Sequence, residues 1–98
     1  MKRDEALKIL MASQGRLGEF CVKSLAIFGS VARDEATESS DVDVLGEFDE
    51  ESQVGLFTFI RLKQFLAELL GCTVDLVTAQ ALRQEMREQI LPEAIHAA

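Results

Sequence analysis

Two aspartates separated by one residue, Asp41 and Asp43, are the side chains in this sequence best spaced to bind a metal ion. They begin an apolar segment that is typical of a β-strand, where residues i and i+2 point to the same face. Two carboxylates on one face can bind the same cation or pair of cations. Without a cation they would repel, since unit charges near 4 Å cost about 4 kcal/mol at an effective dielectric constant of 20. The pair therefore predicts a divalent metal site.

A third carboxylate, Asp75, stands inside the apolar segment 74–77. If that segment is a strand beside the one that carries Asp43, the three carboxylates form a triad. Hard oxygen ligands favour Mg²⁺ or Mn²⁺, and two such ions can activate an attacking hydroxyl and stabilise a leaving pyrophosphate. Each aspartate could instead be a solvated residue near a turn. This alternative suits Asp41, which follows two serines, better than Asp75, because an aspartate within an apolar strand is disfavoured without a partner.

A glycine–serine pair, Gly29 and Ser30, directly follows an apolar run and is separated from the aspartates by ten residues. A strand that ends in glycine can turn sharply and lets a phosphate approach the backbone, and a helix that starts after Ser30 would supply free N–H groups. The Ser30 hydroxyl and Arg33, one turn later, could also reach a phosphate. A Gly-Ser pair alone is usually only a turn, and Arg33 could equally pair with a nearby carboxylate. The P-loop pattern is absent. The spacing of turn and aspartates is what favours nucleotidyl transfer.

The hydrophobic pattern predicts three short strands with helices between them. The predicted segments are a helix over 3–14, a strand over 24–28, a short helix after Ser30, a strand over 41–48, a long helix over 54–70, a strand over 73–77, and a helix from Thr78 that carries Leu82, Met86 and Ile90 and ends near Pro92. Ser30 and Thr78 are predicted to be helix N-caps, and Gly71 a C-cap. The order predicts an α/β fold with a small three-stranded mixed sheet flanked by helices.

Two of the predicted helices carry hydrophobic faces. The expected core positions are Leu7, Leu10 and Met11 in the first helix, and Leu56, Phe59, Leu62, Leu66 and Leu69 in the long helix. Four further residues extend the apolar arc of the long helix, namely Phe57, Ile60, Phe65 and Leu70. They could form an interface for a homo- or hetero-oligomer through the 54–70 helix, or they could all be buried beneath the sheet and the terminal helix.

The composition predicts one small domain over residues 1–98, with 48% apolar and 28% charged residues. The net charge of −7 argues against a nucleic-acid partner and for metal ions or a basic protein partner.

No apolar stretch is long enough to span a membrane and no signal-type segment follows Met1, so we expect a cytoplasmic protein without a membrane partner. Cys21 and Cys72 are expected to be buried and reduced, and His96 to be exposed rather than catalytic.

At the turn and the aspartates the sequence resembles the minimal nucleotidyltransferases of the polymerase-β-like superfamily, stand-alone domains often paired with a HEPN-type toxin. The matching segments are Leu25-Ala26-Ile27-Phe28-Gly29-Ser30-Val31-Ala32-Arg33, Ser40-Asp41-Val42-Asp43-Val44-Leu45, Val54-Gly55-Leu56-Phe57 and Val74-Asp75-Leu76-Val77. The likeness covers residues from about 22 to 95. Its glycine–serine and double-aspartate element is specific, and the later segments support it.

The resemblance implies roles for five of these residues. Gly29 and Ser30 would contact the triphosphate of ATP, Asp41 and Asp43 would bind Mg²⁺ or Mn²⁺, and Asp75 would be the third carboxylate, which assists deprotonation of an acceptor hydroxyl. It also implies an antitoxin that transfers AMP from ATP to a tyrosine of its HEPN ribonuclease partner. A non-catalytic module that binds nucleotide, or that neutralises the toxin by complex formation alone, is the alternative.

Two positions depart from the family pattern. Asp34 stands where glycine is common, which restricts the backbone and adds negative charge near the phosphate turn. Gly46 stands where an apolar strand residue is usual, so we expect a weakened or bulged strand there. Either departure could lower the activity.

Overall fold

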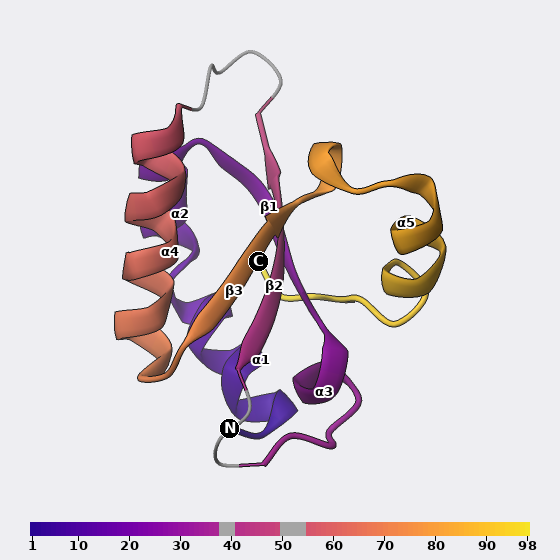
Figure 1. Cartoon of the computed structure of the whole chain (residues 1–98). Helices are drawn as coiled ribbons and strands as arrows, with labels where there is room; N and C mark the ends of the chain where they lie inside the picture. Colours follow the sequence, from indigo (N-terminus) through magenta and orange to yellow (C-terminus); the bar gives the residue numbers. More distant parts are fainter. Residues whose placement is uncertain (38–40, 50–54) are drawn as a thin grey trace.

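The computed structural model of this protein describes residues 1–37, 41–49 and 55–98 (Figure 1). Ser40 and Val54, which belong to the segments that resemble the minimal nucleotidyltransferases, lie outside the described residues. The turn and all three aspartates lie within them.

A four-stranded mixed sheet forms the centre of the molecule, in the order β3-β2-β1-β4 (Figure 1). The strands are β1 (Val22–Phe28), β2 (Val42–Phe48), β3 (Val74–Thr78) and β4 (Ile95–His96). Strand β1 is antiparallel to β2 and to β4, whereas β2 and β3 are parallel. The predicted α/β class is confirmed, but the predicted count of three strands is too low. β4 was missed because two residues carry no alternation, and their pairing with Ala26 and Ile27 is long-range.

Helices cover both faces of this sheet (Figure 1). They are α1 (Arg3–Ala12), α2 (Gln14–Leu17), α3 (Gly29–Ala32), α4 (Leu56–Leu70) and α5 (Gln84–Ile90), with short 3₁₀ turns η1 (Gly18–Phe20) and η2 (Ala79–Ala81). Figure 1 shows α1, α2 and α4 on one side of the sheet and α5 on the other. No helix among the described residues is both long and apolar enough to cross a bilayer.

The alternation along β2 divides the buried side chains into two clusters. Val42 and Val44 belong to the main core, which includes Leu62 and Leu66 of α4. Leu45 belongs to a second cluster with Leu82 and Ile90, on the α5 side. Since neighbours along a strand point to opposite faces, Asp43 shares the face of Leu45 and is directed away from the main core.

Two residues predicted to lie in the core, Met11 and Leu56, are exposed instead. Met11 follows the buried Leu10 by one position and therefore lies about 100° around the helix. In α4 the buried residues are Leu62, Leu66 and Leu70, and Leu56 lies off this stripe in the first turn. Met86, which was predicted on the same helix as Leu82, is exposed in α5, whereas Leu82 precedes that helix and is extended.

The predicted helix ends agree with the structure at two of three places. Gly71 adopts a left-handed conformation after α4, and its N–H donates to the carbonyl of Ala67. The Thr78 hydroxyl accepts a hydrogen bond from the N–H of Ala81 and caps η2, a 3₁₀ turn rather than the α-helix expected there. Ser30 is not an N-cap, because α3 already begins at Gly29. The helix thus begins two residues earlier than predicted, with Phe28 at the N-cap position.

Gly46 does not produce the expected bulge. It is buried in β2 and pairs regularly with Leu25 on one side and Thr78 on the other. The irregularity in the β1–β2 register lies between Val22 and Ser24. A glycine in a regular strand weakens it through backbone entropy and an unfilled side-chain position.

We expect Gly46→Ala to stabilise the protein by about 0.5–1 kcal/mol, the range for a glycine replaced at a compatible position. A Cβ at this position would meet Leu76, Leu25 and Phe48 side-chain atoms at 3.5, 3.6 and 3.8 Å, which is ordinary van der Waals contact. Urea denaturation measures the change. Gly46→Val is the matched oversized control and should be destabilising, since only one methyl group fits. A loss of stability in Gly46→Ala would show that the strand needs the glycine.

Candidate active site

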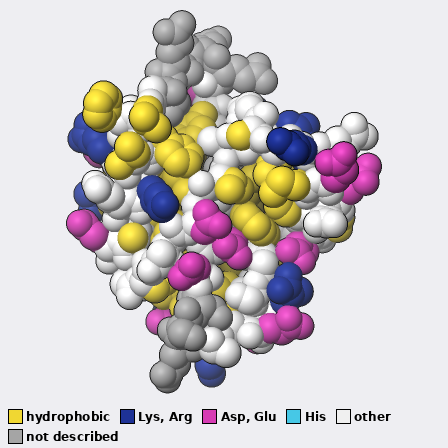
Figure 2. All heavy atoms as spheres, in the orientation of Figure 1, with side chains coloured by type: hydrophobic (Ala, Val, Ile, Leu, Met, Phe, Trp, Pro, Cys, Tyr) yellow, Lys and Arg dark blue, Asp and Glu magenta, His cyan; other side chains and the backbone are white. Residues whose placement is uncertain are grey.

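Asp43 of β2 and Asp75 of β3 lie directly opposite each other in the parallel register of these two strands. Neighbouring strands are about 4.8 Å apart, and residues in register point to the same face. Asp41 lies two residues before Asp43, just outside β2, and is exposed, as is Asp75. Figure 2 shows acidic side chains gathered in the middle of the side of the molecule that faces the viewer, between two groups of hydrophobic side chains. The expected placement of β3 beside β2 is therefore observed.

The electrostatics of the site centre on Asp43. Partial burial raises the pKa of the Asp43 carboxyl above its ordinary value of 3.8, and the nearby charges of Asp75 and Asp41 raise this pKa further. Arg33 has the opposite, weaker effect on it. An ionised Asp43 is thus held among other anions, and a cation at this place would relieve the repulsion.

The aspartates fit Mg²⁺ or Mn²⁺ in the chemistry of their donor atoms, since both ions prefer carboxylate oxygens. Within the described residues, however, no three acidic, histidine or cysteine side chains are grouped closely enough to enclose an ion. The predicted triad of Asp41, Asp43 and Asp75 is therefore not gathered around one ion position in this structure, and its role as a metal site stays a prediction. Mg²⁺ is usually held by one or two carboxylates together with water and substrate phosphates.

Gly29 forms the turn between β1 and α3 and contacts the aspartate site. Its φ of +70° is unfavourable for residues other than glycine. A Cβ at this position would also collide with the Oδ2 atom of Asp43. After the turn, the backbone carbonyl of Ser30 accepts the N–H of Glu35 at 2.8 Å and closes the end of α3. The glycine therefore lets the backbone N–H groups of the turn and the carboxylate of Asp43 lie side by side.

Glu93, which follows α5, contacts the same turn and was missed in the sequence. Its Oε1 accepts the N–H of Gly29 at 3.1 Å, and its Oε2 accepts Nη1 of Arg33 at 3.0 Å. Arg33 also donates from Nε to Oε2 of Glu35 at 3.1 Å, so the ion-pair alternative expected for Arg33 is observed. These two carboxylates, Glu35 foremost, raise the pKa of Arg33. Nothing local in the sequence marks Glu93, because its partners are more than fifty residues away.

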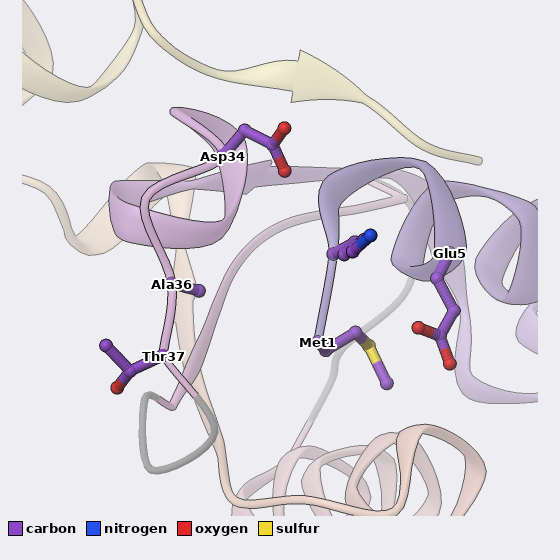
Figure 3. Close-up of a pocket in the computed structure, with 6 residues that line it drawn as sticks. Met1, Glu5, Asp34, Ala36 and Thr37 are labelled. Atoms are coloured by element: carbon purple, nitrogen blue, oxygen red, sulfur yellow. The ribbon is translucent and has the colours of Figure 1, made fainter.

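Asp34 shows why glycine is common at its position. Its φ is +58°, in the left-handed region where aspartate is tolerated better than most residues. The carboxylate also accepts the backbone N–H of Arg3 at 3.4 Å. Asp34 lines a hollow of about 470 Å³ between the start of α1 and the segment after α3, with Met1, Glu5 and Ala36 (Figure 3). Among the described residues that line it, none belongs to the predicted site.

A mixed sheet that places facing aspartates beside a glycine–serine turn defines a nucleotidyltransferase fold. The chain belongs to the nucleotidyltransferase domain family, whose model matches residues 7–96. It is 39% identical over 94 residues to the protein adenylyltransferase MntA of Thermococcus cleftensis, covering 95% of this chain and 93% of that protein.

Solved structures give the same fold. One assigned as a minimal nucleotidyltransferase superposes with a TM-score of 0.81 at 38% identity, covering 97% of this chain and 95% of the other. The antitoxin from a complex with the tri-AMPylated HEPN toxin of Shewanella oneidensis superposes with a TM-score of 0.60 at 16% identity, covering 91% of this chain and 71% of the other. At 16% identity this second likeness concerns the fold alone.

Proposed function

We propose that this protein transfers AMP from ATP to a hydroxyl group of a partner protein. The observation that carries the proposal is the register of β2 and β3, which sets Asp43 opposite Asp75 beside the turn at Gly29. The likeness to MntA of Thermococcus cleftensis, a named protein adenylyltransferase, supports the choice of ATP and of a protein acceptor.

In the proposed reaction, backbone N–H groups at Gly29 and Ser30 bind the phosphates, and the Arg33 guanidinium adds a charged donor. Asp41 and Asp43 would hold Mg²⁺ or Mn²⁺, which supplies charge neutralisation for the triphosphate. Asp75 accepts the proton of the acceptor hydroxyl. The hydroxyl oxygen forms a bond to the α-phosphorus, the bond from that phosphorus to the bridging oxygen breaks, and pyrophosphate leaves.

For the acceptor we propose a HEPN-type toxin in the cytoplasm, with this chain as its antitoxin. The start of α4 suits a protein partner, because Leu56 and Phe57 are 70% and 82% exposed and Ile60 is 40% exposed. The other two residues of the predicted interface have partners within the chain. Phe65 stacks on Phe20 with ring centroids 5.3 Å apart, and Leu70 is buried. An interface through α4 would therefore involve its first turns.

Transfer of labelled AMP tests the function. The protein is incubated with Mg²⁺, α-labelled ATP and the protein encoded by the neighbouring gene, and label on that protein is measured. We expect Asp41→Asn/Asp43→Asn to reduce transfer by about 10³-fold or more, as expected when preorganised charges at the reacting phosphate are lost. Asp4→Asn is the control, since its side chain is 88% exposed on α1.

The same mixture distinguishes AMP transfer from the alternative, in which the chain neutralises the toxin by complex formation alone. If the double variant still binds and neutralises the toxin while neither protein transfers label, the chain acts by complex formation and the proposed chemistry is wrong.

A further inference from the structure

The carboxylate of Glu93 engages both donors that the proposed function assigns to phosphate, Gly29 N–H and Arg33. We propose that Glu93 is an intramolecular competitor of the nucleotide, whose carboxylate occupies the place of a phosphate group until a nucleoside triphosphate displaces it. This inference deepens the proposed function and rests on it for the identity of the ligand.

The contact has the chemistry of phosphate recognition. A carboxylate and a phosphate group both present anionic oxygens that can accept from a backbone N–H and a guanidinium at once. Glu93 does so with its two oxygens, one to each donor, at 3.1 and 3.0 Å. A phosphate that approached these donors would meet a like charge, so both anions cannot occupy the donors together.

The fold holds the Glu93 backbone beside the turn. Strand β4 pairs Ile95 with Ile27 in antiparallel register. Glu93 lies two residues before Ile95 and Gly29 two residues after Ile27, so both stand just outside the same end of the paired strands. On the other side, the N–H of Glu93 donates to the carbonyl of Ile90 at 3.1 Å, at the end of α5. Because the chain is hydrogen-bonded on both sides of Glu93, its backbone stays beside the turn. The carboxylate can therefore leave the two donors by rotation of the Glu93 side chain alone.

The Glu93 carboxylate also has room to move away from the turn. The Glu93 side chain is 30% exposed and that of Arg33 46% exposed, so both can reorient toward solvent. Glu93 also adds negative charge to the field at Asp43. Its departure therefore frees two donors and lowers the local negative charge at the moment a polyanion arrives. The apparent affinity for the nucleotide is reduced by the fraction of molecules in which Glu93 is bound.

Binding of inorganic tripolyphosphate to the full chain, measured by calorimetry with and without Mg²⁺, tests this directly. We expect Glu93→Ala to bind it about tenfold tighter than the wild type, and Glu93→Gln about threefold tighter, because Gln can still accept from Gly29 but carries no charge. Thermal melts confirm that the variants fold, and Glu93→Gln keeps the test valid should Glu93→Ala fail to fold.

Two control variants show whether a change in affinity comes from the Glu93 contact itself. They test the two other possible causes, which are the loss of a negative charge and the loss of a carboxylate paired with Arg33. Glu35→Gln removes the other carboxylate on Arg33 but leaves the contact at Gly29 in place. Glu88→Gln removes one negative charge from an exposed position of α5. Both should change the affinity less than twofold, a change within the range of surface charge effects.

The outcomes are distinguishable from those of the transfer assay. Unchanged, weaker or undetectable tripolyphosphate binding by both Glu93 variants overturns the inference, and it does so even where the wild type transfers AMP. Tighter binding by the Glu93 variants without any AMP transfer supports the competitor and refutes the proposed function. A loss of affinity confined to the samples with Mg²⁺ would make Glu93 a metal ligand and also refute its role as a competitor.

Discussion

Asp43→Asn is expected to make the protein more stable while it removes the activity. In the absence of a cation, the ionised Asp43 is partly buried and faces the charges of Asp75 and Asp41, which together raise its pKa. The neutral amide removes this repulsion, and we expect a gain of at most about 1 kcal/mol, because solvent screens the charges around this partly exposed carboxyl. For a chain of 98 residues that gain corresponds to an increase in Tm of up to about 4–8 °C. Thermal denaturation in EDTA measures it.

The pH dependence of this gain has a definite sign. Because the pKa of Asp43 is raised in the folded state above the 3.8 of the free side chain, the folded protein binds the proton more tightly than the unfolded chain does. The repulsion is absent at low pH, where the carboxyl is protonated in both states, and it develops as the pH rises through the folded-state pKa. The stability difference between Asp43→Asn and the wild type should therefore be largest near neutral pH and vanish in acid.

Mg²⁺ should reverse the order of the two proteins. A ligand that binds only the folded state stabilises it in proportion to the logarithm of its concentration, and the variant has lost a carboxylate ligand. Asp4→Asn loses only an exposed ion pair with Arg3 and a carboxylate in the first turn of α1, so it should lower the Tm slightly and leave its response to Mg²⁺ unchanged. An Asp43→Asn protein that is less stable than the wild type in EDTA would mean that Asp43 is a structural residue rather than a strained ligand.

The local parts of the site could be predicted from sequence because their geometry depends on neighbours along the chain. The spacing of Asp41 and Asp43 fixes their common direction once the segment is a strand. Gly71 was recognisable as a helix end for the same reason, since only a glycine readily adopts the left-handed conformation there. The position of Asp75 needed one tertiary assumption, that β3 lies beside β2, and the register shows that it does.

The parts that could not be predicted depend on contacts between distant segments. Strand β4 has two residues and pairs with a strand almost seventy positions earlier, so no periodicity identifies it. Glu93 reaches Gly29 only because β4 pairs in this register. The exposure of Leu56 in α4 likewise follows from which side of the helix packs on the sheet, a choice that its apolar residues left open.

Gly29→Ala is expected to have the second large effect, through two separable causes. The backbone there has a φ of +70°, which costs a residue with a Cβ about 1–2 kcal/mol. The new methyl group would also collide with the Asp43 carboxylate, so that the carboxylate or the turn must move. We expect a total loss of stability of about 2–4 kcal/mol, within the range of strain and overpacking effects. AMP transfer should fall by about 10²-fold or more, because misplacement by about 1 Å is enough for that.

Gly71→Ala separates the two causes of that loss. Gly71 has the same φ of +70°, and nothing lies within 4 Å of the place its Cβ would occupy, so this variant measures backbone strain alone. The excess loss in Gly29→Ala is then the collision with Asp43, and it should disappear when Gly29→Ala is made in an Asp43→Ala background. A coupling energy of about 1 kcal/mol or more between positions 29 and 43 is expected for groups in direct contact.

If the two substitutions are additive and Gly29→Ala costs no more than Gly71→Ala, the turn and the aspartate are not in contact. The phosphate-binding and metal-binding halves of the proposed site would then be unconnected.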